Sequence, residues 1–103
     1  MLNLFRKRYD AISYNCGHFV IDFLNEIGNN NSLDVRDVTT LRNLKRIPLP
    51  ISPCVVMMRN AHRDLHCGVF YLNKVVHLIE SGVRADQLSD LTEFKIDFYQ
   101  CPQ

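Results

Sequence analysis

The sequence predicts a single α+β domain, residues 1–103, in which N-terminal helices pack on an antiparallel β-sheet. The chain has 103 residues, of which 47% are hydrophobic, and this is enough for one modest core. Apolar residues recur at helical spacing before Pro48, whereas after Pro53 they form the short runs typical of strands. Helices followed by consecutive strands indicate an α+β arrangement.

The first helix is predicted from Cys16 to Ile27. Apolar residues at helical spacing give this segment one buried face: Phe19, Val20, Phe23, Leu24 and Ile27. Gly28 follows where glycine commonly ends a helix, because it adopts the left-handed conformation at little cost. A second helix is predicted from Leu33 to Lys45 with Ser32 as its N-cap, and the prolines that follow impose an extended connector.

The second half of the chain is predicted to form four strands. They are Cys54–Met58, Leu65–Leu72, Val75–Ile79 and Phe94–Gln100. Asn73-Lys74 separates the middle two strands and is interpreted as the two-residue turn of a β-hairpin. A short helical turn is predicted between Ala85 and Leu91. The strands are therefore expected to form an antiparallel meander.

Charge and hydropathy argue against several partner classes. Twelve Lys and Arg residues balance 11 Asp and Glu residues, so nothing favours electrostatic capture of nucleic acid or an anionic membrane. No stretch reaches the roughly 18 consecutive apolar residues of a membrane span. The segment Met1–Tyr9 lacks the apolar core of a secretory signal. We therefore expect a cytoplasmic protein, or one delivered without a signal peptide, for example inside a phage particle.

The cysteines allow more than one interpretation. There are four, at Cys16, Cys54, Cys67 and Cys101. An even number permits disulfides, but the missing export signal favours free thiols. A zinc site is an alternative, since suitable ligand types occur at Cys16 and His18 and again at His62, His66 and Cys67. Structural zinc sites usually repeat a Cys-x-x-Cys or similar pair, and no such repeat is present. No metal or cofactor is therefore predicted.

Cys16 is the candidate nucleophile because it is placed at the start of the first predicted helix. The helix dipole and unpaired backbone N–H groups stabilise a thiolate at that position and lower its pKa. The same N–H groups, including that of Gly17, could hold the oxyanion of a tetrahedral intermediate. The alternative is that Cys16 is simply a small buried residue.

A cysteine nucleophile needs a base within hydrogen-bond reach and a third group that orients the base. His66 and His77 lie on the two strands of the predicted hairpin and supply two imidazoles. A turn at Asn73-Lys74 would place His77 opposite about Tyr71, so the imidazoles would meet only if the hairpin is bulged or the sheet curved.

The remaining polar candidates are expected to be structural or exposed. Cys67 is predicted to point into the core, since neighbours along a strand face opposite sides. His18 is interpreted as structural or exposed, and His62 as an exposed turn residue. Glu80 and Asp86 are interpreted as surface charges.

Two segments carry a resemblance to a known family. Residues 14–20, Tyr-Asn-Cys-Gly-His-Phe-Val, are similar to a nucleophile motif that is typically Asp-Cys-Ser-Gly followed by apolar helix residues. Residues 66–72, His-Cys-Gly-Val-Phe-Tyr-Leu, with Val-Val-His at 75–77, are similar to a block in which a His-x-Gly-apolar-Tyr strand carries the base and the next strand carries a third polar residue. Both motifs are those of the NlpC-like cysteine peptidases, and the resemblance extends from about Tyr9 to Ile79.

The resemblance implies a papain-like fold and assigns the site. Cys16 would be the nucleophile, His66 the base and His77 the group that orients His66. Tyr9 or Tyr14 would correspond to the tyrosine that these enzymes place before the nucleophile to help bind the oxyanion.

The chain departs from that pattern at two positions next to the nucleophile. Asn15 replaces the usual aspartate and Gly17 the usual serine, and the segment before Cys16 is short. The run Asn-Cys-x-His-Phe-Val also resembles the nucleophile box of the lecithin retinol acyltransferase group. In that group the base histidine precedes the cysteine, whereas here every histidine follows Cys16, which favours the NlpC-like order.

The leading hypothesis is an amidase or endopeptidase that acts through an acyl-enzyme, and the resemblance implies bacterial cell-wall peptide as its substrate. Acyl transfer to an amine or alcohol would use the same residues. A third hypothesis, from a different class, is a papain-like binding or inhibitory module without turnover, for example a phage protein with a host-protein partner.

Overall fold

The computed structural model describes residues 2–12, 14–28, 41 and 43–101. Its helices are α1 (Leu2–Phe5), α2 (Cys16–Glu26) and the short 3-10 helix η2 (Leu88–Asp90). Its strands are β1 (Arg46–Ile47), β2 (Cys54–Arg59), β3 (Leu65–Tyr71), β4 (Lys74–Ile79), β5 (Gly82–Asp86) and β6 (Lys95–Tyr99).

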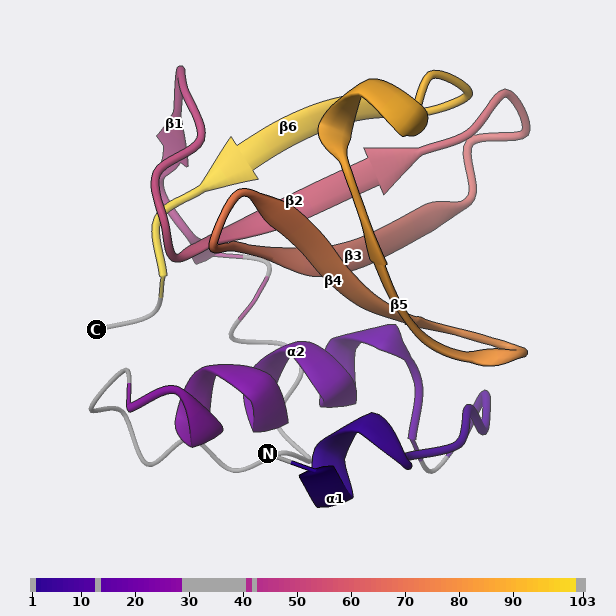
Figure 1. Cartoon of the computed structure of the whole chain (residues 1–103). Helices are drawn as coiled ribbons and strands as arrows, with labels where there is room; N and C mark the ends of the chain where they lie inside the picture. Colours follow the sequence, from indigo (N-terminus) through magenta and orange to yellow (C-terminus); the bar gives the residue numbers. More distant parts are fainter. Residues whose placement is uncertain (1, 13, 29–40, 42, 102–103) are drawn as a thin grey trace.

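The strands form one antiparallel sheet, and α2 packs across one of its faces (Figure 1). The order in the sheet is β1-β6-β2-β3-β4-β5. The helix lies against the middle of the sheet, where it contacts β3 and β4. The predicted α+β class, with a helix on an antiparallel sheet, is confirmed. No helix in the described part of the chain has the length and apolar character needed to cross a membrane.

Helix α2 begins at Cys16 because Asn15 caps it. The Oδ1 atom of Asn15 accepts hydrogen bonds from the N–H groups of Gly17, at 2.9 Å, and His18, at 3.3 Å. In return, Nδ1 of His18 accepts the N–H of Asn15 at 3.1 Å, which completes a capping box. The helix ends before Gly28, whose φ of 79° is the left-handed conformation expected there.

The sheet carries a core on each face. The helix-side core contains the apolar face of α2 and side chains from three strands, among them Val55, Cys67, Val69, Val76 and Leu78. The opposite face carries a second core: Cys54, Val56, Met58, Phe70, Val75 and Leu91. Since neighbours along a strand alternate between these cores, Cys67 points toward α2 while His66 and Gly68 belong to the opposite face.

The hairpin turn differs from the prediction. Tyr71 pairs with Lys74, so the turn is Leu72-Asn73 rather than Asn73-Lys74. Both turn residues have positive φ, 49° and 67°, as a type I′ hairpin turn requires. The shift moves His77 from the predicted level of Tyr71 to a position beside Gly68, one step beyond the Val69–Val76 pair.

The sequence analysis also missed two strands. Arg46–Ile47 pairs with β6 as an edge strand, and Gly82–Asp86 pairs with β4, where a helical turn was expected from Ala85. The helical turn is shorter than predicted and is η2. The predicted second helix, Leu33–Lys45, lies mostly outside the described residues.

Candidate active site

Cys16 is the first residue of α2, and its thiol lies against β3. The Sγ atom of Cys67 donates a hydrogen bond to Sγ of Cys16 over 3.5 Å. This bond is the largest of the causes that lower the pKa of Cys16 to about 4, and hydrogen bonds from the His66 side chain and the Cys67 backbone act in the same direction. The charge of a protonated His66 also lowers it, whereas burial opposes the shift. Cys16 is therefore a thiolate at neutral pH.

His66 and His77 are in direct contact. Nε2 of His66 and Nδ1 of His77 are 2.7 Å apart, and the two rings meet edge to face with centroids separated by 4.9 Å. His66 is on β3 and His77 is on β4. Because Nε2 of His66 faces His77, Nδ1 is the ring nitrogen left for the thiol of Cys16. The structure thus brings together the three residues that the sequence analysis assigned to catalysis.

The chain of contacts continues to a carboxylate. Nε2 of His77 lies 2.7 Å from Oδ2 of Asp86, and the other carboxylate oxygen accepts a hydrogen bond from Arg84 at 3.0 Å. The Asp86 side chain is 14% exposed and that of His77 only 5%. The interpretation of Asp86 as a surface charge is wrong, because β5 places its carboxylate against His77.

The charge states of this pair are set by their surroundings. Burial lowers the pKa of His77, although the hydrogen bond to Asp86 partly opposes this. The same hydrogen bond lowers the pKa of Asp86, and Arg84 adds to the effect. At neutral pH the pair is therefore a neutral imidazole beside an ionised carboxylate.

The three residues expected at the oxyanion site, Tyr9, Tyr14 and Gly17, make different contacts in the structure. The hydroxyl of Tyr14 donates to Oδ2 of Asp22 at 2.7 Å, and burial with this carboxylate raises the pKa of Tyr14. Tyr9 packs against the helix-side core. The N–H of Gly17 is used by the Asn15 cap. The N–H of His18 is also taken by the Asn15 side chain and that of Phe19 by the Asn15 carbonyl, which leaves the N–H of Cys16 as the candidate donor at this end of α2.

His18 and His62 take structural or exposed positions. His18 is buried and completes the capping box, and its ring stacks on Tyr14 with centroids 6.1 Å apart. His62 is exposed in the turn between β2 and β3. Both observations agree with the roles expected for these residues.

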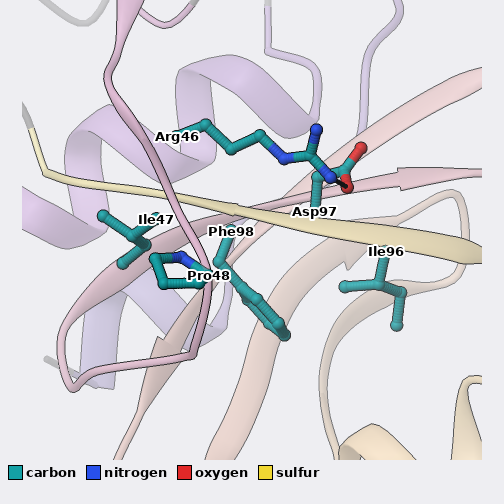
Figure 2. A pocket seen from close by; sticks show the side chains of 6 residues that line it. All are labelled: Arg46, Ile47, Pro48, Ile96, Asp97 and Phe98. Atoms are coloured by element: carbon teal, nitrogen blue, oxygen red, sulfur yellow. Dashed lines mark hydrogen bonds and ion pairs between the residues drawn. The ribbon is translucent and has the colours of Figure 1, made fainter.

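Two pockets lie on the face of the sheet opposite α2. One has a volume of about 260 Å³ and is lined by both site histidines: His66, His77, Ile79, Arg84, Asp86, Asp90, Leu91, Glu93 and Phe94. The other, about 380 Å³, lies between β1 and β6 beside the ion pair of Arg46 and Asp97 (Figure 2). In the sheet order β6 and β2 separate it from β3, so it is away from Cys16.

The reactive groups described at the site are protein side chains. All four cysteines are free thiols. The described residues contain no group of three or more His, Cys, Asp or Glu side chains arranged to hold a metal ion. What the arrangement offers is a low-pKa thiolate, an adjacent imidazole and a second imidazole backed by a carboxylate.

Comparisons with known proteins do not assign the chain to a family, since no family model, curated protein or solved structure matches it.

Proposed function

We propose that the protein is a papain-like cysteine hydrolase that cleaves amide bonds through an acyl-enzyme. The observation that carries this proposal is the contact between His66 and His77 together with a Cys16 thiol whose pKa is lowered to about 4, in part by a hydrogen bond from His66. A thiolate–imidazole pair with an oriented base is the arrangement that nucleophilic cysteine catalysis requires. The resemblance of both segments to the NlpC-like peptidases supports the same conclusion, and adds bacterial cell-wall peptide as the substrate class.

The reaction would proceed in two halves. The Cys16 thiolate attacks the amide carbonyl carbon, and the N–H of Cys16 at the start of α2 donates to the oxyanion that forms. Protonated His66 gives its proton to the departing amine, which leaves an acyl group on Cys16. His66 then removes a proton from water, and the hydroxide releases the acid and restores the thiolate. With an amine in place of water, the same steps would transfer the acyl group.

The first test is the pH dependence of alkylation by iodoacetamide, with each cysteine resolved by mass spectrometry. The alkylation rate of Cys16 should fall to half of its maximum near pH 4. Burial raises the pKa of Cys54 and raises that of Cys101 to about 11, so both serve as internal references that stay slow at neutral pH. In His66→Ala the Cys16 midpoint should move upward. A Cys16 that titrates like a free thiol in the wild type would contradict the proposal.

Turnover is the second test. Wild type should release new amino groups from soluble cell-wall peptides, and Cys16→Ala should not. Mass spectrometry after rapid acid quenching should find the acyl group on Cys16. A reactive Cys16 without any acylation would instead favour the binding-module hypothesis.

A further inference from the structure

Each of the two hydrogen bonds of His77 has only one possible donor, so the position of the shared proton can be assigned in both. An ionised Asp86 can only accept, so Nε2 of His77 must carry the proton shared over 2.7 Å. A neutral His77 then has a lone pair on Nδ1, which accepts the proton on Nε2 of His66 over the next 2.7 Å. With its Nε2 proton shared with His77, His66 exchanges a proton with Cys16 through Nδ1, the nitrogen that remains.

We infer that Asp86 is a positioning residue, which fixes the tautomer of His77 and through it keeps Nδ1 of His66 as the nitrogen that exchanges a proton with Cys16. This inference rests on the proposed function. Arg84 donates a hydrogen bond to Oδ1 of Asp86 at 3.0 Å. This bond holds the carboxylate in place and leaves Oδ2 for His77. Without Asp86, His77 can reverse its tautomer, and a reversed His77 would donate from Nδ1, so His66 would lose the acceptor for its Nε2–H.

Other charges face the same pocket and must be separated from Asp86 in any test. Asp90 and Glu93 line the pocket from the segment that follows β5, and Arg84 and His66 line it from the sheet. Asp97 offers a matched control, because it also pairs with an arginine, Arg46 at 2.7 Å, but at the β1–β6 side of the sheet. Replacing Asp97 removes an equivalent carboxylate without touching either histidine.

The experiment compares Asp86→Ala, Asp86→Glu and Asp97→Ala in two measurements. Long-range proton–nitrogen NMR spectra report the imidazole tautomers directly. Wild type and Asp97→Ala should show His77 with its proton on Nε2, whereas Asp86→Ala should also populate the Nδ1–H form. The alkylation midpoint of Cys16 should rise in Asp86→Ala, because a protonated His66 loses the acceptor for its Nε2–H and stabilises the thiolate less, and it should recover in part in Asp86→Glu.

The two readouts distinguish the possible failures. An unchanged His77 tautomer and Cys16 midpoint in Asp86→Ala would overturn the role of Asp86, although the proposed function would stand. A wild-type Cys16 with an ordinary thiol midpoint would overturn the proposed function itself. Equal alkylation rates of wild type and Asp86→Ala well above the midpoint would show that the variant keeps the site folded.

A second inference depends on a different contact, that between the two sulfur atoms. Cys67 is 6% exposed and packs in the helix-side core, and its Sγ lies 3.5 Å from Sγ of Cys16. A disulfide requires about 2.05 Å between sulfurs, so a movement of about 1.5 Å at the start of α2 would join them. Cys54 and Cys101 lie elsewhere, and Sγ of Cys101 donates to the carbonyl of Pro53 at 3.3 Å.

We propose that peroxide converts Cys16 and Cys67 into a reversible disulfide, which switches the proposed hydrolase off and protects its nucleophile. The Cys16 thiolate attacks one oxygen of hydrogen peroxide, forming a sulfenic acid and releasing hydroxide. The Cys67 sulfur then attacks the Cys16 sulfur, and the hydroxyl group leaves as water with the Cys67 proton. The two thiols lose two electrons in total, which reduce one peroxide. A dithiol reductant reverses the last step by exchange.

The test uses several equivalents of hydrogen peroxide per protein, enough to take an unprotected thiol past sulfenic acid, followed by non-reducing digestion and mass spectrometry. Wild type should give a Cys16–Cys67 linked peptide, and dithiothreitol should restore iodoacetamide labelling of Cys16. In Cys67→Ala, Cys16 should instead proceed to sulfinic acid and stay unlabelled after reduction, whereas Cys54→Ala should behave as wild type. Absence of the linked peptide from the wild type, or equal recovery of Cys16 in wild type and Cys67→Ala, would overturn the inference. Mass spectrometry detects the linked peptide whether or not the protein turns over a substrate, so this test does not depend on the turnover assay.

Discussion

His77 packs directly against the backbone of Gly68. A Cβ atom built at Gly68 would lie 2.9 Å from Cβ of His77 and 2.9 Å from the carbonyl oxygen of Val76. The missing side chain therefore lets β4 approach β3 closely at this point. His66 is two residues before Gly68 and faces the same side of the sheet, so this approach brings the two imidazoles into contact.

We predict that Gly68→Ala destabilises the protein and also separates the two histidines. The added methyl group would force the strands apart, and overpacking of this kind costs about 1–3 kcal/mol of unfolding free energy. The His66–His77 contact should lengthen, so the alkylation midpoint of Cys16 should rise. Val55→Ala, at a buried position on β2 in the helix-side core, should lower stability but leave the midpoint unchanged. If the two variants shift the midpoint equally, the effect is general destabilisation.

We predict that Asn15→Ala weakens the start of α2. The substitution removes the acceptor for two N–H groups, and loss of such a cap costs about 1 kcal/mol. For a domain of this size the melting temperature should fall by about 4–8 °C. Asn15→Asp should retain most of the stability, because aspartate caps a helix equally well. Thermal unfolding followed by circular dichroism tests both variants, and a full loss in Asn15→Asp would contradict the capping role.

The fold was largely predictable because its main elements carry periodic apolar residues. Helix α2 and strands β2, β3 and β4 bury one or both faces, and β6 alternates apolar and polar residues, so their apolar spacing identifies them. The missed strand β5 has no buried residue at the sheet edge, and the missed β1 has only two residues. An edge strand with little burial leaves no periodic signal in the sequence.

The site was predictable only in part. Cys16, His66 and His77 stand out because helix position and strand membership are local properties. The contact between the histidines depended on the turn, and Leu72-Asn73 carries none of the glycine that usually marks a type I′ turn. Asp86 depended on the unpredicted β5, which returns it to His77 after the tight turn that ends at Gly82. Such contacts follow from register, which sequence spacing alone does not determine.

We predict that Tyr14→Phe lowers stability but not reactivity. Its hydroxyl donates to Asp22 at 2.7 Å, and losing one such bond costs about 1–2 kcal/mol. Asp22→Ala should produce a similar loss, and the double variant should be little worse than either single one, because both remove the same interaction. A fall in kcat of Tyr14→Phe at unchanged melting temperature would instead restore Tyr14 to the oxyanion site.

The last prediction concerns the pH dependence of stability, which we expect to fall as the pH is lowered from about 9 to about 4, the range set by Cys16 and His77, and to fall further below pH 3.8, where Asp86 contributes. The folded pKa values of Cys16, His77 and Asp86 are all below their ordinary values. In each case the unfolded chain binds more protons than the native one over part of the acid range, so stability rises with pH there. Each such group contributes up to about 1.4 kcal/mol per pH unit within its own window. Urea unfolding at several pH values measures the slope. Cys16→Ala should flatten it, because one of the three groups is removed, whereas a wild type that gains stability on acidification would contradict the shifted charges on which the site depends.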